Sequence, residues 1–389
     1  MGVAFSRFPA EVLELTGANL PPSAGFPPVP VTSRIQNHPL YREDVAAVSS
    51  LALPWGKLAG KTVLVAGARG LIGTFLCDVL LARGDVSVVA LGRDGKKARA
   101  AFAAHEGNPR LVIFPHDVNR SIDAAAAGKA DFVVHLASTT HPKAYATRPV
   151  ETIFTNVIGT GNLLSYAADV GAERFLFASS VEIYGENRGD TALFREDSCG
   201  AIDCNTLRAG YPESKRCGEA LCQAYRAEKG LDCVVARLAR SYGPTLLGED
   251  TKALSQFLAK ALAGEDIVLK SAGEQFYSFT HAADAVSGLL TVLLRGADGE
   301  AYNLADPAGD IRLKDLAGLV AREAGRKVVF DLPDAVEAAG FSRATQARMD
   351  AAKLRALGWR ARYGIEEGIR RTLAVLRAAH AALPPTAGE

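Results

Sequence analysis

Residues 61–73 read KTVLVAGARGLIG, and this stretch decides the fold class. Residues 62–66 are a short apolar run suited to a buried parallel strand, and 71–83 have the apolar spacing of a helix. Where the strand leads into the helix, residues 67–73 form a GxxGxxG pattern. Glycines let a turn tighten and let the backbone approach a pyrophosphate, which the positive N-terminus of the following helix attracts. We therefore expect a strand, a turn and a helix that hold a dinucleotide.

Short apolar runs and segments with helical spacing continue to alternate downstream of this unit. Such alternation predicts a parallel, doubly wound sheet with helices on both faces. The predicted fold class is therefore α/β, a Rossmann-type sheet with a smaller C-terminal α/β lobe for the substrate. The predicted strands are 62–66, 86–91, 111–114, 131–136, 174–178 and 233–238, and the long helices are 150–170 and 211–230.

Composition and pattern divide the chain into three regions. Residues 1–57 are a proline-rich, partly helical arm, 58–243 form the dinucleotide-binding domain, and 244–389 form mainly the lobe. A return of the last region to the Rossmann sheet is left open. The expected helices outside the central region are 41–53, 254–263, 282–295, 313–324 and 365–382, and the expected short strands are 267–270 and 301–304.

The bulk composition argues against several classes of partner. Of the 389 residues, 48% are hydrophobic and 22% charged, with a net charge of +1. A near-neutral chain with short apolar runs gives no reason to expect nucleic acid or a membrane as partner. The six cysteines form no CxxC pair, and no histidine lies at zinc spacing. We therefore expect reduced thiols and no bound metal. Because no basic and apolar leader is visible, we also expect a cytoplasmic protein.

The residues after the second predicted strand bear on the choice between NAD and NADP. An acid is expected there for the ribose of NAD, but Gly92 occupies the position and Arg93 follows it. Together with Arg69 in the glycine turn, Arg93 suits a ribose 2′-phosphate, which favours NADP slightly over NAD. Asp94, one position later, keeps NAD open. Asp117, after the third strand, is a candidate for the adenine amino group.

A second motif, YPESK at 211–215, places Tyr211 and Lys215 one helical turn apart on one face. A free tyrosine has a pKa near ~10, and a nearby ammonium together with the positive nicotinamide of the cofactor favours the phenolate. Such a phenolate takes a proton from a sugar hydroxyl while a hydride leaves the same carbon. Ser180, at the carboxyl end of the fifth strand, is expected to share that proton, and Lys215 to bond the nicotinamide ribose.

Several motifs occur together in the order typical of one enzyme family. Residues 58–380 resemble the extended short-chain dehydrogenase/reductases of the nucleotide-sugar epimerase/dehydratase family. The resemblance implies a nucleotide-diphosphate sugar in the C-terminal lobe, oxidation of its C4 hydroxyl by bound NAD(P), and a homodimer formed through helices 150–170 and 211–230. The motifs are GARGLIG at 67–73, HLAS at 135–138, NxxGT at 156–160, SSVEIYG at 179–185, YPESK at 211–215, RLARSYGP at 237–244, SFTHAADA at 278–285 and LGW at 357–359.

The residues after Ser180 separate the reactions of this family. Sugar 4,6-dehydratases typically carry Thr-Asp-Glu, whereas this chain has Ser180-Val181-Glu182, and valine cannot donate a proton to a leaving hydroxyl. UDP-glucuronate decarboxylases are similar to this chain in keeping the glutamate and in having arginines that match Arg208 and Arg216. An epimerase needs neither acid. Glu182 stays a candidate base or polar anchor.

Two positions depart from the family pattern. Relatives usually have an arginine, which grips the diphosphate, where Tyr277 stands. Arg343 and Arg348 are candidate substitutes for it. Arg240 replaces a small or amide residue after the sixth strand, and it either meets a substrate carboxylate or forms an internal ion pair.

The first hypothesis is an enzyme that oxidises C4, epimerises or decarboxylates the keto sugar and reduces it back. The alternatives are an NADPH-dependent 4-keto-sugar reductase, an atypical 4,6-dehydratase, and a non-catalytic Rossmann binding protein. The predicted catalytic residues are Tyr211, Lys215, Ser180 and Glu182. The predicted cofactor-binding residues are Gly67, Arg69, Gly70, Leu71, Ile72, Gly73, Arg93, Asp117, Val118, Leu136, Ala137, Ser138, Tyr211 and Lys215. The predicted substrate-binding residues are Ser180, Glu182, Arg208, Arg240, Tyr277 and Arg343.

Overall fold

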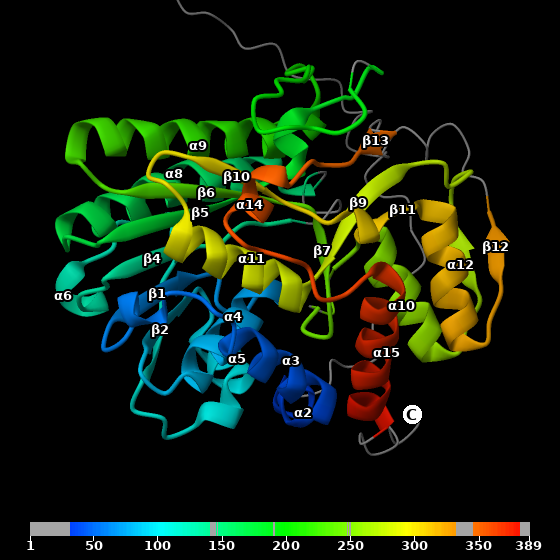
Figure 1. Ribbon diagram of the computed structural model, residues 1–389, viewed down its shortest axis with the longest axis horizontal. Coiled ribbons are helices and arrows are strands. Elements are labelled where there is room, and N and C mark those ends of the chain that lie inside the picture. Colours follow the sequence, from blue (N-terminus) through cyan, green and yellow to red (C-terminus); the bar gives the residue numbers. More distant parts are fainter. Residues whose placement is uncertain are drawn as a thin grey trace, which may run out of the picture.

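The computed structural model describes residues 32–140, 145, 147–189, 191–246, 248, 250–331 and 345–381. At the centre of these residues lies a parallel sheet of seven strands in the order β10-β6-β5-β4-β1-β2-β3 (Figure 1). The predicted α/β, Rossmann-type fold is confirmed. The strands are β1 (Thr62–Ala66), β2 (Ser87–Gly92), β3 (Leu111–Pro115), β4 (Phe132–His135), β5 (Arg174–Ser180), β6 (Cys233–Leu238) and β10 (Ala301–Leu304).

The strand order reverses next to β1. This strand pairs with β2 on one side and with β4 on the other. Ligands of doubly wound sheets bind in the crevice at such a reversal, outside the carboxyl ends of the strands. The glycine turn follows β1 and the segment Leu136–Ser138 follows β4, so both lie at this crevice.

Two layers of helices cover the sheet, and the alternation of side chains along β1 shows why (Figure 1). Val63 and Val65 belong to a core shared with one layer, whereas Leu64 and Ala66 belong to a core shared with the other. Because both faces are buried, the strand is apolar throughout. The first layer contains α3 (Pro39–Ser49), α4 (Leu71–Ala82), α5 (Gly95–Ala101) and α11 (Ala282–Arg295), and the second contains α6 (Ala124–Ala127), α8 (Pro149–Asp169) and α9 (Gly210–Lys229).

The chain crosses between the sheet and a smaller lobe more than once. β7 (Arg240–Tyr242) leaves β6 and pairs with β9 (Phe276–His281), which belongs to the lobe. The chain then returns through α11, whose residues are buried from Ala282 to Leu294, and through β10, which pairs with β6. The domain boundary at residue 243 stays a prediction.

The lobe has its own sheet, in which β11 and β13 flank β9, and its own core. A second, two-stranded sheet joins β8 to β12. Sequence reasoning missed β7, β9 and the short strands β11 to β13. The lobe elements are α10 (Ala253–Ala263), β8 (Ile267–Leu269), β11 (Asp310–Arg312), α12 (Leu313–Ala324), β12 (Val328–Phe330), β13 (Gln346–Ala347), α14 (Ala352–Ala356) and α15 (Ile365–Ala381).

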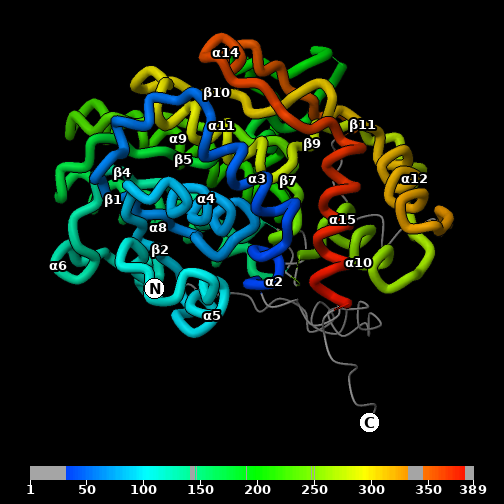
Figure 2. The backbone as a smooth tube through the Cα atoms, turned by 60° about the horizontal axis from the view of Figure 1, so that its bottom comes forward, coloured from blue at the N-terminus to red at the C-terminus, as the bar shows by residue number. Residues whose placement is uncertain are grey.

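The described part of the N-terminal arm packs on the body as two helices, α2 (Thr32–Asn37) and α3 (Figure 2). The expected helix at 41–53 corresponds to α3, which begins earlier because His38 caps it and Pro39 suits a first helical position. Tyr41 donates to Asp78 of α4 at 2.6 Å. Residues 1–31 of the arm lie outside the described residues. Among the helices that the structure describes, none has both the length and the apolar character that crossing a bilayer requires.

Candidate active site

The turn after β1 needs glycine at two positions. Gly67 has a φ of +82°, and a Cβ on it would lie 2.7 Å from the backbone nitrogen of Ala137. A Cβ on Gly73 would collide with the carbonyl oxygen of Gly67. Glycine is therefore required because the turn, the segment after β4 and the first turn of α4 are in direct backbone contact.

The N-terminus of α4 is prepared for an anion. Gly70 is the N-cap, no side chain caps the helix, and its first turn holds no acid. The backbone N–H groups of Leu71 and Ile72 belong to that first turn, where the helix dipole is positive. This cradle of glycines at the start of a helix fits the pyrophosphate of a dinucleotide.

Other predicted cofactor residues lie along the same edge of the sheet. The Leu136 backbone nitrogen donates to Ala66 at the end of β1. Ser138 donates to Asn156 of α8 at 2.7 Å. Asp117 accepts from the backbone of Asn119, and Val118 packs so closely on Gly159 that a Cβ there would lie 2.8 Å away. The crevice that these residues line is continuous with the glycine turn.

The residues expected to read the adenosine ribose are already engaged. Arg93 Nη1 lies 2.7 Å from Glu151 Oε1. Asp94 caps α5, and the hydrogen bond from the backbone of Lys97 lowers the pKa of its carboxyl, with a smaller contribution from Arg69. Arg93 therefore stands in an ion pair across to α8, while Asp94 caps α5 and Arg69 lies in the glycine turn after β1.

Ser180, Tyr211 and Lys215 come together in one place, as their motifs suggest. Ser180 is the last residue of β5, while Tyr211 and Lys215 lie in the first two turns of α9, which packs on β5. The hydroxyl of Ser180 lies near the phenol of Tyr211 and favours its charged form. Lys215 Nζ donates to the carbonyl of Ala178 at 2.8 Å. All three side chains are buried.

Burial dominates the electrostatics of the catalytic pair in the protein alone. It raises the pKa of Tyr211 to about 12, although the Ser180 hydroxyl opposes the rise. Burial also lowers the pKa of Lys215 to about 7. The expectation that the ammonium and the positive nicotinamide of a bound cofactor together favour the phenolate stays a prediction.

Tyr145 is a site residue that sequence reasoning missed. Its ring stacks on that of Tyr211, with centroids 4.9 Å apart and planes at 29°, and its hydroxyl favours the charged form of the Tyr211 phenol. The guanidinium of Arg208 lies over the Tyr145 ring, with its Cζ 4.9 Å from the ring centroid. The segment after β4 carries no periodic signal that would have marked this tyrosine.

A second missed feature is a chain of hydrogen bonds behind the tyrosine. The Asn156 amide nitrogen donates to Ser214 Oγ at 2.9 Å, and Ser214 donates to the carbonyl of Tyr211 at 2.8 Å. Asn156 also accepts from Ser138 at the cofactor crevice. The asparagine was noted only as part of a motif, and its position fixes the start of α9 against that crevice.

The predicted substrate residues fall into two groups. Glu182, Arg208, Arg240 and Tyr277 lie together beyond Tyr145, with Arg208 2.6 Å from Glu182. Arg343 lies outside the described residues. Arg348 lies apart from this group, over the ring of Phe276 at 4.3 Å, and donates to the carbonyl of Ala192.

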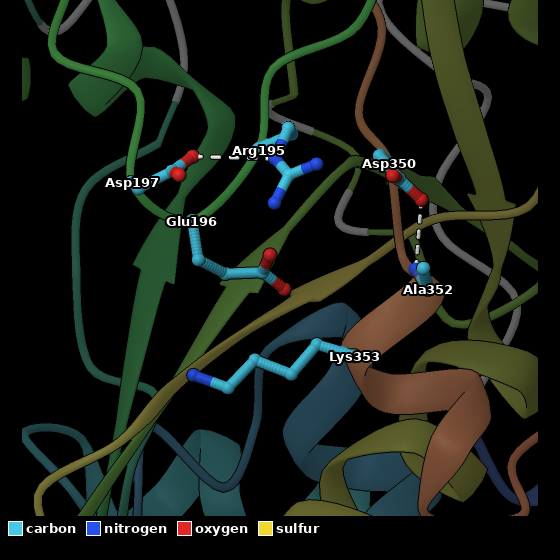
Figure 3. A pocket seen from close by; sticks show the side chains of 6 residues that line it. All are labelled: Arg195, Glu196, Asp197, Asp350, Ala352 and Lys353. Atoms are coloured by element: carbon cyan, nitrogen blue, oxygen red, sulfur yellow. Dashed lines mark hydrogen bonds and ion pairs between the residues drawn. The ribbon is translucent and has the colours of Figure 1, made fainter.

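A separate hollow of about 350 Å³ lies beside β10 and holds none of the predicted site residues. Figure 3 shows that charged side chains of both signs line it, from the loop before α9 and from the start of α14. The residues that line the hollow are Arg195, Glu196, Asp197, Asp350, Ala352 and Lys353.

Within the described parts of the chain, no three histidine, cysteine or acidic side chains lie close enough to hold a metal ion.

Comparisons with known proteins agree with this fold and crevice. UDP-glucuronic acid decarboxylase 2 of Arabidopsis thaliana is 35% identical over 69% of this chain, which spans only 58% of the length of that protein. A dTDP-glucose 4,6-dehydratase from Streptomyces venezuelae, solved with NAD bound, is 27% identical with a TM-score of 0.70 over 81% of this chain and 96% of that one.

A third comparison supports the fold alone. UDP-glucuronic acid 4-epimerase from Bacillus cereus, in complex with UDP-glucuronic acid and NAD, is 20% identical with a TM-score of 0.71 over 81% of this chain and 99% of that one. The profile of the NAD dependent epimerase/dehydratase family matches residues 63–305, which is more than half of the chain. The glycine cradle, the switch-point crevice and this match agree, and the chain belongs to the NAD dependent epimerase/dehydratase family.

Proposed function

We propose that this protein oxidises the C4 hydroxyl of a nucleotide-linked sugar, acts on the 4-keto intermediate and reduces it back with the same cofactor. The observation that carries the proposal is the meeting of buried Ser180 at the end of β5 with Tyr211 and Lys215 of α9, at the sheet edge that holds the glycine cradle. A non-catalytic binding protein has no use for this constellation.

The residues divide the proton work between them. Tyr211 takes the proton of the C4 hydroxyl, and Ser180 holds that hydroxyl in line by a shared hydrogen bond. When bound, the nicotinamide accepts the C4 hydride, and its positive charge favours the phenolate. Lys215, fixed on the carbonyl of Ala178, places its ammonium for the cofactor ribose. Tyr211 returns the proton when C4 is reduced again.

For the fate of the keto sugar, we propose decarboxylation of a uronic acid. A 4-keto uronate is a β-keto acid, so the C5–C6 bond breaks with its electron pair moving into the C4 carbonyl and carbon dioxide leaving. C5 then takes a proton. The name and the 35% identity of the Arabidopsis decarboxylase support this fate. Val181 has no proton to donate, which argues against the alternative dehydration.

Epimerisation at C4 is the second candidate, and a specific observation favours it. Arg208 and Arg240 both face the carboxylate of Glu182, so the region is rich in positive charge. Guanidinium groups stabilise a substrate carboxylate in its charged form. Loss of carbon dioxide removes that charge, so a tight grip on the carboxylate opposes decarboxylation.

One experiment separates these fates and tests the function. The purified protein is incubated with UDP-, dTDP-, GDP- and CDP-sugars without added cofactor, and the products are followed by mass spectrometry and NMR. Loss of carbon dioxide indicates decarboxylation, and an unchanged mass with inverted C4 indicates epimerisation. Obligatory, stoichiometric consumption of NADPH would refute the proposed function in favour of the reductase alternative.

We propose NAD as the resident cofactor. The family is described as NAD dependent, and the Streptomyces relative was solved with NAD. The slight preference for NADP finds no support in these comparisons, and Arg93, its main basis, is paired with Glu151. The preference stays a prediction that binding measurements can test.

We also propose a homodimer. The outer face of α8 exposes Val150, Phe154 and Ile158, which lie one helical turn apart. The exposed fractions of these residues are 60%, 50% and 41%. Leu207, just before α9, is 68% exposed. A stripe of large apolar side chains of this kind is typical of a protein interface.

The cytoplasmic location also stays a prediction.

A further inference from the structure

Glu182 lies between two arginines at the edge of the active site. Its two carboxylate oxygens lie 2.6 Å from Arg208 Nη2 and 3.6 Å from Arg240 Nη2. One negative charge therefore faces two positive charges. The Arg208, Glu182 and Arg240 side chains are 36%, 24% and 21% exposed, so part of each is open to the site.

The two arginines are also short of hydrogen-bond acceptors. The Nη1 atom of each is shielded from solvent and has no hydrogen-bond partner among the described residues. Buried donors are normally paired, and an unpaired one on a charged group is costly. The excess charge and the unpaired donors together favour a second anion between Arg208 and Arg240.

The position of the arginines places that anion close to the reacting carbon. Arg208 lies over the ring of Tyr145, which stacks on the ring of Tyr211. Both Glu182 and Arg208 act electrostatically on the phenol of Tyr211. With C4 at the phenol, a group one or two carbons farther along the sugar lies beside the arginines. In a uronic acid that group is the C6 carboxylate.

Arg240 is held in place by an aromatic ring on the neighbouring strand. β7 and β9 are parallel, with Arg240 opposite Phe279. The guanidinium of Arg240 lies 3.6 Å from the ring centroid of Tyr277, which is a stacking contact. This contact limits the rotamers of Arg240 and directs its planar fork, so less freedom is lost when a carboxylate binds.

We infer that Arg208 and Arg240 form a carboxylate clamp that selects sugar acids over neutral sugars. Arg240 is the specificity-determining residue, and Tyr277 is the positioning residue that orients it. The inference rests on the proposed function, because it takes the substrate to be a nucleotide-linked sugar. It adds the side chains that recognise the carboxylate of the proposed uronic acid and makes that recognition independent of the fate of the keto sugar.

The test compares the binding of UDP-glucuronate, UDP-glucose and UDP to the full chain by calorimetry. Charge-assisted hydrogen bonds contribute about 1.5–3 kcal/mol, so Arg240→Gln is expected to weaken UDP-glucuronate roughly 10- to 100-fold. UDP-glucose and UDP lack the carboxylate, and their affinities are expected to stay within about twofold. Arg240→Lys keeps the charge without the fork, so an intermediate loss is expected.

Tyr277 is tested by variants that separate the ring from its hydroxyl. Tyr277→Phe keeps the stacking face and is expected to preserve the preference for UDP-glucuronate over UDP-glucose, whereas Tyr277→Leu is expected to reduce it. Arg312→Gln is the matched control, because Arg312 also lies over an aromatic ring, Phe276, and pairs with a glutamate, but at the exposed edge of the lobe. It is expected to leave all three affinities unchanged.

Three results would overturn the clamp. An equal loss of all three ligands in Arg240→Gln would place Arg240 at the diphosphate. Unchanged affinities in that variant would make it only an internal partner of Glu182. A wild-type protein that binds UDP-glucose as tightly as UDP-glucuronate would refute the clamp while leaving C4 oxidation intact. By contrast, a protein that turns over none of the nucleotide sugars would refute the proposed function itself.

Discussion

The ring of Tyr145 stacks on the ring of Tyr211, with the centroids 4.9 Å apart and an angle of 29° between the planes. Tyr145 therefore packs directly against the proposed acid/base residue. Its other contact, with Arg208, links the phenol of Tyr211 to the carboxylate clamp. The reacting centre and the proposed recognition site share this one side chain.

Tyr145→Phe keeps the stacking and removes the hydroxyl that favours the charged Tyr211 phenol. Because one hydrogen-bonding group is worth about 0.5–1.5 kcal/mol, a fall in kcat of roughly 2- to 10-fold is expected at saturating substrate. Tyr145→Ala also removes the stacking contact and should cost more. Tyr225→Phe removes a hydroxyl that bonds Ser165 between α9 and α8, farther along α9 from Tyr211, and should leave kcat unchanged. Wild-type kcat in both Tyr145 variants would show that the stack has no part in turnover.

Arg93→Ala tests the cofactor assignment. Arg93 is paired with Glu151 and is expected to contribute little to NAD binding, so the Kd for NAD should change less than about twofold. The Kd for NADP should rise more, since a guanidinium near the ribose is what a 2′-phosphate requires. Fluorescence titration with both dinucleotides measures this, with Arg110→Ala as the control. Equal losses for NAD and NADP would contradict the reasoning.

Asp44→Ala tests how the N-terminal arm is joined to the body. Asp44 of α3 lies 2.6 Å from Arg371 of α15, and the two side chains are 2% and 9% exposed. Removing Asp44 takes from Arg371 its buried partner and leaves it only the more exposed carboxylates of Glu43 and Glu367, so the free energy of unfolding should fall by about 3–5 kcal/mol. Urea denaturation measures the change.

Glu43→Ala is the matched control for Asp44→Ala. Glu43 contacts the same Arg371 at 3.3 Å, but its side chain is 51% exposed. Exposed pairs contribute about 0–1 kcal/mol, so this variant should stay close to wild type. Equal effects of the two variants would mean that burial of the Asp44 pair does not matter.

His281 predicts a dependence of stability on pH. Burial, with a smaller contribution from Arg371, lowers the pKa of His281 to about 3. Below about pH 6.5 this histidine is protonated in the unfolded chain, whereas it stays neutral in the folded protein down to about pH 3. His281 therefore makes the protein less stable as pH falls from 6.5 towards 3. His281→Asn, which can still cap α11, should flatten the fall.

Urea unfolding of wild type and His281→Asn at pH 7 and pH 4.5 provides the measurement. Burial raises the pKa of neighbouring Asp284 to about 6, and this shift makes the folded protein more stable as pH falls. Asp284 is present in both proteins, so its effect on stability is the same in each. The comparison therefore isolates the histidine. Parallel stability curves for the two proteins would refute the prediction.

The central sheet could be predicted from the sequence because its strands are buried on both faces. The runs at β1, β4 and β5 are almost wholly apolar, and each is followed by a helical pattern. β7 and β9 gave no such signal, because Arg240–Tyr242 is short and polar and Phe276–His281 alternates irregularly. These strands are defined by pairing with each other across the lobe.

The same distinction applies to the site. Ser180, Tyr211 and Lys215 were predicted because each lies in a local motif whose strand or helix fixes its direction. Tyr145 and the pairing of Arg93 with Glu151 depend on tertiary contacts between distant segments, and no local pattern reports them. The burial that raises the pKa of Tyr211 could not be predicted either, because spacing along a helix does not reveal desolvation.

The most direct test of the account follows the hydrogen at C4. UDP-glucuronate carrying deuterium at C4 is converted by the purified protein without added cofactor, and the product is examined by NMR and mass spectrometry. If the hydride moves to a bound dinucleotide and returns, deuterium is retained at C4, and Tyr211→Phe, with unchanged folding by circular dichroism, abolishes conversion. Product that has lost the deuterium from C4, or a Tyr211→Phe variant within tenfold of wild-type activity, would contradict the account.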